Sequence, residues 1–312
     1  MWKPSRNAGS PTEARLPYGI RVYAVGDVHG RTDLLNRQMA QIDADEVRYP
    51  CIRSIVVFLG DYIDRGPDSR GTIELLIAST RMREVVCLKG NHETFVRRFL
   101  DASLSLNDWR LMGGFETLAS YGLKPSLGLN DGEHERLAEE LRVAMPAQHL
   151  AFLDSLPSSF ICGDFFFVHA GVRPGIALDR QTEDDLLWIR DDFLHYGSPF
   201  EKFVVHGHTP VNAPEVRFNR VSIDTGAFAT GRLSCVAIEG SDIVPLLDIR
   251  DWAADGDTRT ESVQTKRDGG LDALLRQNRG LYVPQSAQRP DPSYPEATRP
   301  FRRKTASRII AP

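Results

Sequence analysis

One apolar run that ends in a short acidic motif constrains the fold of this chain most strongly. Residues 55–59 (Ile-Val-Val-Phe-Leu) are short and β-branched, which is typical of a buried strand. They lead directly into residues 60–66, Gly-Asp-Tyr-Ile-Asp-Arg-Gly. Because an unpaired buried carboxylate is costly, acids at a strand end need a cation. A metal ion would supply one for Asp61, and the planar guanidinium of Arg65 suits a phosphate group.

The same pattern, a strand followed by a polar motif, occurs twice more in the first third of the sequence. Residues 20–30 contain an alternating strand that ends in Gly-Asp-Val-His-Gly, and residues 84–93 contain another that ends in Lys-Gly-Asn-His-Glu. Helical periodicity separates the strands, from about residue 34 and again around 73–77. The order β-α-β-α-β favours a parallel sheet. All three motifs would then lie at the carboxyl ends of the strands, along one edge.

The middle of the chain changes character. Residues 94–156 are rich in helical patterns, and we expect them to form an insertion that packs beside the active-site mouth as a helical cap. Strand character resumes at residues 160–168, which end in His-Ala-Gly, and at residues 203–205, which end in His-Gly-His-Thr-Pro. Three closing strands are predicted, for which an antiparallel arrangement is one option, at residues 220–225, 233–238 and 243–247.

The domain organisation follows from these patterns. Residues 1–18 are polar with Pro and Gly, and we expect a flexible arm. Residues 19–250 would form the catalytic domain. In residues 251–312 charged, Pro, Gln, Ser and Gly residues dominate, so this segment cannot bury enough apolar surface to offset its ordering entropy. It is predicted to be a poorly ordered tail with one short helix near residues 271–276.

Composition excludes several classes of function. The net charge of −4 and the pI near 6.1 give no electrostatic case for binding nucleic acid or an anionic membrane. No run approaches the roughly 18 apolar residues of a membrane span, and the N-terminus lacks an apolar signal core. The sequence therefore predicts a cytoplasmic protein.

The cysteines exclude one phosphatase mechanism. A Cys-x5-Arg phosphatase needs an arginine six residues after its cysteine. The positions six residues after the four cysteines hold Val57, Glu93, Val168 and Ser241. No cysteine pair has CxxC spacing, so a cysteine zinc site is not expected either.

The polar groups at the strand ends share one kind of chemistry. All are carboxylate, amide or imidazole groups, namely Asp27, His29, Asp61, Asn91, His169 and His208. Such hard oxygen and nitrogen ligands suit Mn, Fe or Zn. Six groups are too many for one closed tetrahedral site. They suit two ions that share one carboxylate and lie about 3.5–4 Å apart, a geometry that can clamp a phosphate.

These motifs resemble those of the PPP-type metal-dependent serine/threonine protein phosphatases in their bacterial and phage branch, within the calcineurin-like metallophosphoesterase superfamily. The resemblance covers about residues 20–250 and rests on five ordered motifs, at residues 26–30, 60–66, 90–93, 169–171 and 207–209. It implies an α/β calcineurin-like metallophosphoesterase fold with a central β-sandwich flanked by helices. Asp64, Arg65 and Glu93 point to the PPP branch rather than to the wider superfamily.

The resemblance also implies a role for each site residue. It assigns two divalent ions, Mn²⁺ first with Fe or Zn as alternatives, whose ligands are Asp27, His29 and Asp61 for the first ion and Asp61, Asn91, His169 and His208 for the second. A hydroxide that bridges the ions would attack phosphorus in line, without a phosphoenzyme.

The remaining implied roles concern the substrate. His92 would protonate the leaving alkoxide and would be oriented by Asp64; a positioned acid is worth about 10²–10⁴-fold in rate. Arg65, Asn91 and Arg190 would bind the phosphate group, with Arg190 assigned on a short Leu-Trp-Ile-Arg match. The implied substrate is a phosphoprotein or phosphopeptide, and the resemblance identifies no regulatory subunit.

Three functions remain open at this point. The first is a phosphatase for phosphoserine and phosphothreonine, with phosphotyrosine as an extension. The second is a dinucleoside polyphosphate hydrolase of the symmetrical tetraphosphatase type, against which Asp64 and Glu93 argue. The third is a binding scaffold that has lost activity. Two interpretations of His206 remain open, a core histidine and a metal ligand. Two also remain open for Glu93, an acid favoured at the start of a helix and a partner of the loops that carry the ligands. Trp109 is expected to be a packing residue.

Overall fold

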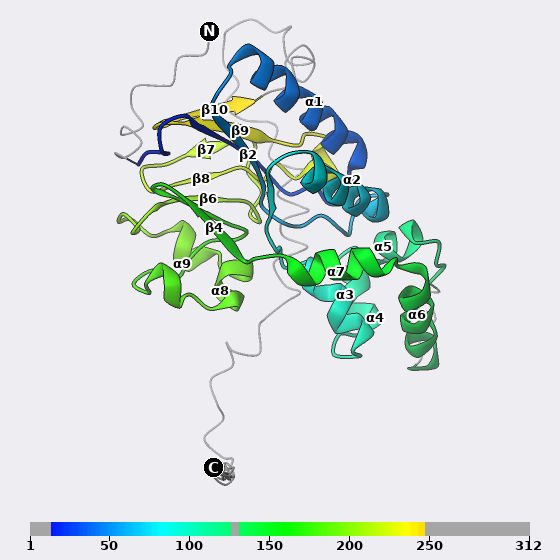
Figure 1. The fold of residues 1–312 in the computed structure, drawn as a ribbon. Coiled ribbons are helices and arrows are strands. Elements are labelled where there is room, and N and C mark those ends of the chain that lie inside the picture. Colours follow the sequence, from blue (N-terminus) through cyan, green and yellow to red (C-terminus); the bar gives the residue numbers. More distant parts are fainter. Residues whose placement is uncertain (1–13, 126–130, 247–312) are drawn as a thin grey trace, which may run out of the picture. The chain divides into compact units, whose positions relative to one another are not determined.

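Two five-stranded sheets form the core of the computed structural model, which describes residues 14–125 and 131–246. Figure 1 shows the sheets with helices beside them. The first sheet has the strand order β10-β9-β1-β2-β3, and the second has the order β4-β5-β6-β8-β7. The predicted α/β metallophosphoesterase fold, a central β-sandwich flanked by helices, is confirmed.

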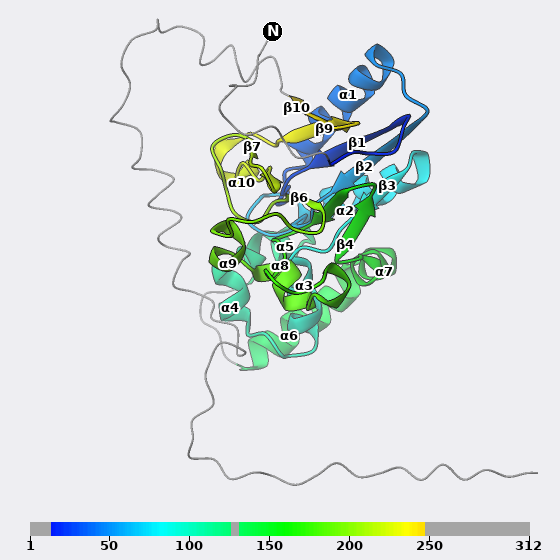
Figure 2. The same cartoon turned by 90° about the vertical axis from the view of Figure 1, so that its left-hand side faces the viewer.

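The first sheet contains the predicted β-α-β-α-β unit. Strand β1 (Ile20–Val25) pairs in parallel with β2 (Arg53–Phe58), which pairs in parallel with β3 (Val85–Cys87). The antiparallel strands β9 (Cys235–Glu239) and β10 (Asp242–Leu246) complete the other edge (Figure 2). The carboxyl ends of β1, β2 and β3 therefore lie at one edge, as the motif positions predict.

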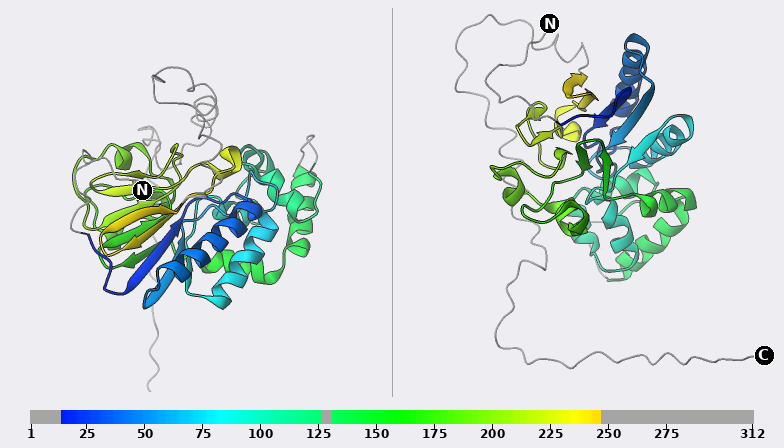
Figure 3. Two further views of the ribbon diagram at one scale, coloured as in Figure 1. Left: turned by 90° about the horizontal axis from the view of Figure 1, so that it is seen from above. Right: turned by 60° about the vertical axis from the view of Figure 1, so that its left-hand side comes forward.

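Two helices connect the parallel strands and lie side by side (Figure 3). They are α1 (Thr32–Arg48) and α2 (Ser69–Met82). The second begins after Asp68, whose carboxylate accepts a hydrogen bond from Gly71 N at 2.8 Å and satisfies a donor of the first turn.

Alternation along the strands divides the apolar side chains between two cores. In β1, Tyr23 and Val25 pack with α1, α2 and the helices that follow them. Val22 and Ala24 point the other way, into the space between the two sheets. A period of two residues places successive side chains on opposite faces, so both faces of this central strand are buried.

The second sheet departs from the prediction at its edges. The single strand predicted at residues 160–168 is an antiparallel hairpin of β4 (Ser159–Cys162) and β5 (Phe165–Val168). Gly163 lies in the turn with φ +57°, a conformation that other side chains rarely adopt. Strand β6 (Phe203–His206) lies in parallel between β5 and β8 (Arg220–Ser222).

Short elements complete the second sheet. Strand β7 (Glu215–Val216) has only two residues, too few to leave a sequence pattern. The outer face of the sheet packs against α8 (Glu183–Trp188) and α9 (Asp191–Leu194), which bury Leu186 and Phe193 against strand residues. A 3₁₀ turn (Leu178–Arg180) precedes α8, and α10 (Ala227–Thr230) follows β8.

The predicted helical insertion is present and extends the helical layer that flanks the first sheet. Its helices are α3 (Glu93–Leu100), α4 (Leu106–Leu111), α5 (Gly114–Ser120), α6 (Asp131–Ala144) and α7 (Ala147–Ser155). Gly113, whose φ is +93°, separates α4 from α5. Apolar residues of these helices share one core with β1, β2, α1 and α2. The insertion therefore packs against the same face of the first sheet as α1 and α2.

The described part of the predicted N-terminal arm is packed. Leu16 is buried, and its N–H donates to Gly240 O at 2.9 Å. Leu16 joins the core between the sheets, whereas Arg15, Pro17 and Tyr18 are exposed. The rest of the arm and the predicted tail with its helix lie outside the described residues. Within residues 14–125 and 131–246, no helix combines the length and apolarity needed to cross a membrane.

Candidate active site

Backbone strain is concentrated in the predicted motifs. A positive φ is uncommon outside glycine because the side chain crowds the backbone. Apart from Ala102, every non-glycine residue of the described ranges with positive φ belongs to a motif, and these residues are His29, Asp61, Asp64, Arg65 and His208. Such strain persists only where the surrounding structure holds it, and it tends to gather at functional sites.

The carboxylate of Asp61 lies at the centre of the site. Its Oδ2 is 3.5 Å from His29 Nε2, and its Oδ1 is 3.4 Å from His169 Nε2. The two oxygens thus face imidazoles from two different strand ends. This is the placement that a carboxylate shared between two cations requires.

Acceptor atoms converge on one side of Asp61. His169 Nδ1 lies 2.9 Å from Leu59 O, and because a carbonyl only accepts, Nδ1 carries the proton. Burial lowers the pKa of His169 to about 4, so the ring is neutral and its Nε2 holds a lone pair. That atom lies 2.9 Å from Asn91 Oδ1 and 3.1 Å from His208 Nδ1. These groups offer a site for a cation.

A second group of possible metal ligands lies on the other side of Asp61. His29 Nδ1 donates to Ile63 O at 2.8 Å, which leaves its Nε2 as a lone pair facing the site. His92 Nε2 also approaches this group, 3.8 Å from Asp61 Oδ2. Asp27 is buried nearby, and its Oδ2 accepts a hydrogen bond from the His208 N–H at 3.1 Å. Asp27 therefore lies beside both sets of ligands.

The charges of the site fit divalent cations. Burial raises the pKa of Asp61 to about 7, with a smaller opposing effect from Arg65. Burial and the nearby Asp224 and Asp61 carboxylates raise the pKa of Asp27 well above its usual range. Three buried carboxylates so close together need positive charge to stay ionised. Two cations held by oxygen and imidazole ligands would supply it.

His92 and Asp64 form a hydrogen-bonded pair. His92 Nδ1 lies 2.7 Å from Asp64 Oδ2, and both side chains are fully buried. The other ring nitrogen, Nε2, points toward the Asp61 carboxylate and lies 3.1 Å from Arg65 Nη2. One nitrogen is therefore fixed by an acid, and the other faces the place where a substrate would react.

Two arginines lie at the site. Arg65 donates through Nη1 to His29 Nε2 at 3.1 Å, and its guanidinium lies over the ring of Phe228 at 5.0 Å. Arg190 follows α8 and is exposed as a whole residue. Partial desolvation and the charge of Arg65 lower the pKa of Arg190, while Asp224, among other carboxylates, raises it. Both guanidinium groups thus lie close enough to the buried carboxylates of the site to influence their charge.

Glu93 connects the loops that carry the ligands. Its Oε2 accepts from the N–H of Asp61 at 2.9 Å and from that of Gly90 at 2.7 Å. Its Oε1 accepts from Tyr62 N at 2.7 Å. Burial raises the pKa of Glu93 to about 7. Of the two interpretations left open by the sequence, the geometry favours a partner that ties two strand ends together.

His206 faces away from the ligand groups. It is buried, and its ring packs edge-on against Phe193 at 4.9 Å. Its Nδ1 contacts Gly207 O at 3.1 Å. Of the two interpretations left open by the sequence, the structure favours a core histidine.

Four residues of the site escaped the sequence analysis. Asp224 and Phe228 follow β8, where a strand was predicted but no motif was recognised. Trp109 and Thr117 come from the helical insertion and donate hydrogen bonds to Asp64. The apolar pattern around Trp109 predicted packing, and nothing in that pattern shows where an indole N–H points.

Two kinds of phosphoesterase are similar to this chain in sequence. The chain is 25% identical over 234 residues to the asymmetrical bis(5'-nucleosyl)-tetraphosphatase PrpE of Anoxybacillus flavithermus, covering 68% of this chain and 88% of that protein. It is 29% identical over 227 residues to serine/threonine-protein phosphatase 1 of Salmonella typhimurium, covering 70% and 92%.

Among solved structures, the cold-active protein-tyrosine phosphatase of a Shewanella species shares the fold. The TM-score is 0.50 at 15% identity, over 78% of this chain and 84% of that one. The sequence profile of the calcineurin-like phosphoesterases matches residues 20–238, more than half of the chain. The protein is therefore a member of the calcineurin-like phosphoesterase family.

Proposed function

We propose that this phosphoesterase is a protein phosphatase that hydrolyses phosphoserine and phosphothreonine, with Mn²⁺ as the working metal. One observation carries the proposal: the His92–Asp64 pair, 2.7 Å apart, directs His92 Nε2 into the ligand cluster. A serine or threonine alkoxide is a poor leaving group and needs a proton as the P–O bond breaks. A histidine fixed by a carboxylate can supply it.

The other side chains have complementary roles in this proposal. Calcineurin-like phosphoesterases use a dinuclear divalent metal site. We assign it to Asp27, His29, Asp61, Asn91, His169 and His208, of which His29, Asp61, His169 and His208 belong to two clusters with metal-ligand spacing. When bound, the cations supply positive charge and an activated water for attack on phosphorus. Arg65 and Arg190 would bind the phosphoryl oxygens and stabilise the charge that develops on them. Asn91 would contact the phosphate beside its metal.

Hydrolysis of a dinucleoside polyphosphate is the second candidate. It is favoured by the similarity to PrpE, which is named for asymmetrical cleavage of bis(5'-nucleosyl) tetraphosphates. Asp64 and Glu93 count against a symmetrical hydrolase but do not distinguish an asymmetrical hydrolase from a phosphatase. A nucleotide leaving group is stable without a proton. His92 would therefore matter much less for that reaction.

A rate comparison separates the two candidates. Metal-stripped protein would be assayed with added Mn²⁺ on a phosphothreonine peptide and on diadenosine tetraphosphate. We expect a higher kcat/KM for the peptide, and no turnover without metal. A higher kcat/KM for the dinucleotide, with ATP and AMP as products, would contradict the proposal and support an asymmetrical hydrolase. Binding of the peptide without turnover would support the inactive scaffold.

A further inference from the structure

We propose that Trp109 and Thr117, two residues of the helical insertion, are positioning residues that fix the Asp64 carboxylate and thereby aim His92 at the leaving group. The inference rests on the role of His92 in the proposed function. It assigns a catalytic purpose to a segment that otherwise supports the core.

Both oxygens of Asp64 are engaged from the insertion. Trp109 Nε1 lies 3.1 Å from Oδ1 and 3.1 Å from Oδ2, and the indole N–H can only donate. The Thr117 hydroxyl donates to Oδ1 at 2.5 Å. These donors leave Oδ2 facing His92 Nδ1 at 2.7 Å. Rotation of the carboxylate away from His92 would break the Thr117 bond.

The backbone of Asp64 is held from the same side. Its N–H donates to Thr117 Oγ1 at 2.9 Å and to Ser69 Oγ at 3.1 Å. The next residue, Arg65, donates its N–H to Gly113 O at 3.1 Å. Because Asp64 and Arg65 both have positive φ, their conformation depends on such external bonds. The insertion thus supplies bonds to the side chain and to the backbone.

A packing role alone would not require these contacts. Trp109 is fully buried and packs against Phe99, with the ring centroids 4.9 Å apart. A phenylalanine could fill much of that space, but it could not donate to Asp64. Likewise, valine matches the shape of Thr117 without the hydroxyl. The chemistry of the two side chains can therefore be tested separately from their volume.

The test uses two aryl phosphates that differ in leaving group. The phenolate released from phenyl phosphate is a poor leaving group and needs an acid to protonate it. The 2,4-dinitrophenolate released from 2,4-dinitrophenyl phosphate is a good leaving group and needs none. With Mn²⁺-loaded full-length protein, we expect Trp109→Phe and Thr117→Val to lower kcat on phenyl phosphate by about 10- to 100-fold. On 2,4-dinitrophenyl phosphate kcat should fall by no more than about threefold, because the acid is not needed there.

Three controls separate positioning from folding. Thr117→Ser restores the hydroxyl and should recover most of the lost rate. Thr72→Val removes another buried hydroxyl, one that contacts Thr32 Oγ1 at 2.9 Å, and should leave both rates unchanged. In a His92→Asn background, Thr117→Val should have no further effect on phenyl phosphate, because the two residues act through one proton transfer.

The outcomes are distinct. Equal losses on both aryl phosphates, or an additive loss in the His92→Asn background, would overturn the inference and leave a structural role. Unchanged rates in both Trp109→Phe and Thr117→Val would overturn it as well. Neither result depends on the natural substrate. The peptide and dinucleotide comparison can therefore fail while the inference stands, and the reverse also holds.

Discussion

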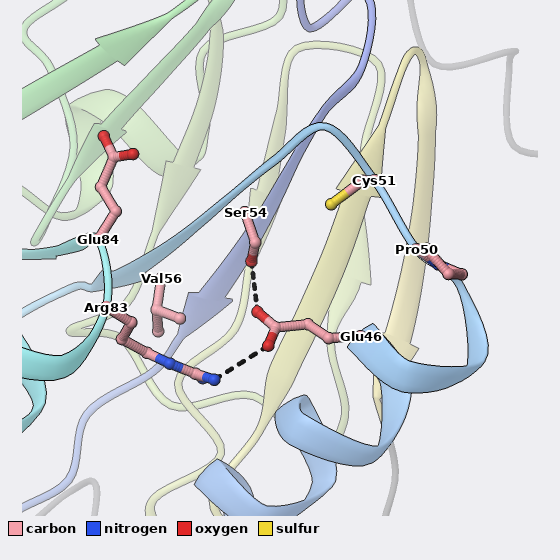
Figure 4. Close-up of a pocket in the computed structure, with 7 residues that line it drawn as sticks. All are labelled: Glu46, Pro50, Cys51, Ser54, Val56, Arg83 and Glu84. Carbon is pink, nitrogen blue, oxygen red and sulfur yellow. Dashed lines mark hydrogen bonds and ion pairs between the residues drawn. The ribbon is translucent and has the colours of Figure 1, made fainter.

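The two ends of strands β1 and β2 carry similar residue types in opposite arrangements. At the amino-terminal ends of these strands, acidic side chains accept hydrogen bonds from donor groups. Glu46 accepts hydrogen bonds from Ser54 Oγ at 2.5 Å and from Arg83 Nη2 at 2.9 Å, and these residues line a cavity of about 340 Å³ (Figure 4). Close by, Arg21 donates to Asp45 at 3.2 Å.

At the carboxyl ends of the same strands, hydrogen-bond acceptors face other acceptors. The oxygens of Asp61 face the unprotonated nitrogens of His29 and His169 at 3.5 and 3.4 Å. Asp27 lies beside two further carboxylates, and burial raises its pKa. The difference indicates that charged residues at a strand end are suited to bind a metal ion when their lone pairs outnumber the hydrogen-bond donors around them. Where donors match them, they form ordinary ion pairs.

Removing the central carboxylate should produce the largest difference between the ends. We expect Asp61→Asn to lower kcat/KM on p-nitrophenyl phosphate by about 1,000-fold or more, because the charge that both cations share is lost and metal catalysis supplies several kcal/mol. Steady-state kinetics with Mn²⁺, together with metal analysis of the purified protein, would check it. If Asp61→Asn retained two metal ions and near-normal turnover, the proposed difference between the two strand ends would be wrong.

The second largest expected effect is the pH dependence of metal binding at the carboxyl ends of the strands. The pKa of Asp61 is raised to about 7 by burial, so in the metal-free protein this group gains a proton as pH falls below 7. A bound cation requires the ionised form, and the proton therefore competes with the metal. We expect Mn²⁺ affinity to fall by about tenfold for each pH unit below 7. Calorimetric titration at pH 7.5 and 6.0 would measure it, and equal affinities would contradict the prediction.

A substitution at the amino-terminal ends of the strands, where the acids are paired with donors, should give the smallest effect. Glu46→Gln removes one charge from its bonds with Arg83 and Ser54, so unfolding free energy should fall by about 0.5–1.5 kcal/mol. Activity should change by less than about twofold, since sites without shared partners act independently. Denaturant unfolding with parallel assays would test this. If Glu46→Gln removed metal or activity, the two ends would not be distinct.

The sequence predicts which strand-end side chains lie close together better than it predicts the groups that position them. The strands before Asp27, Asp61 and Asn91 carry clear apolar patterns, and each motif follows its strand directly, so the shared edge could be foreseen. Trp109 and Thr117 reach Asp64 from helices whose apolar spacing reports only burial. The direction of a hydrogen bond depends on how those helices pack, which a linear pattern does not contain.

Errors in the fold have similar physical causes. The hairpin of β4 and β5 was expected as one strand, because both halves are apolar and only Gly163 marks the turn. Leu16 was assigned to a loose arm because its neighbours are polar. Its burial depends on a long-range contact with Gly240, at the other end of the described chain.

The most direct test of the central claim is anomalous X-ray diffraction from crystals of the full-length protein grown with Mn²⁺. The account predicts two manganese peaks about 3.5–4 Å apart, one on each side of the Asp61 carboxylate. The second peak should lie within bonding distance of His169 and His208. A single peak, or manganese at Glu46 and Arg83 instead, would contradict the assignment of the strand-end cluster as a dinuclear centre.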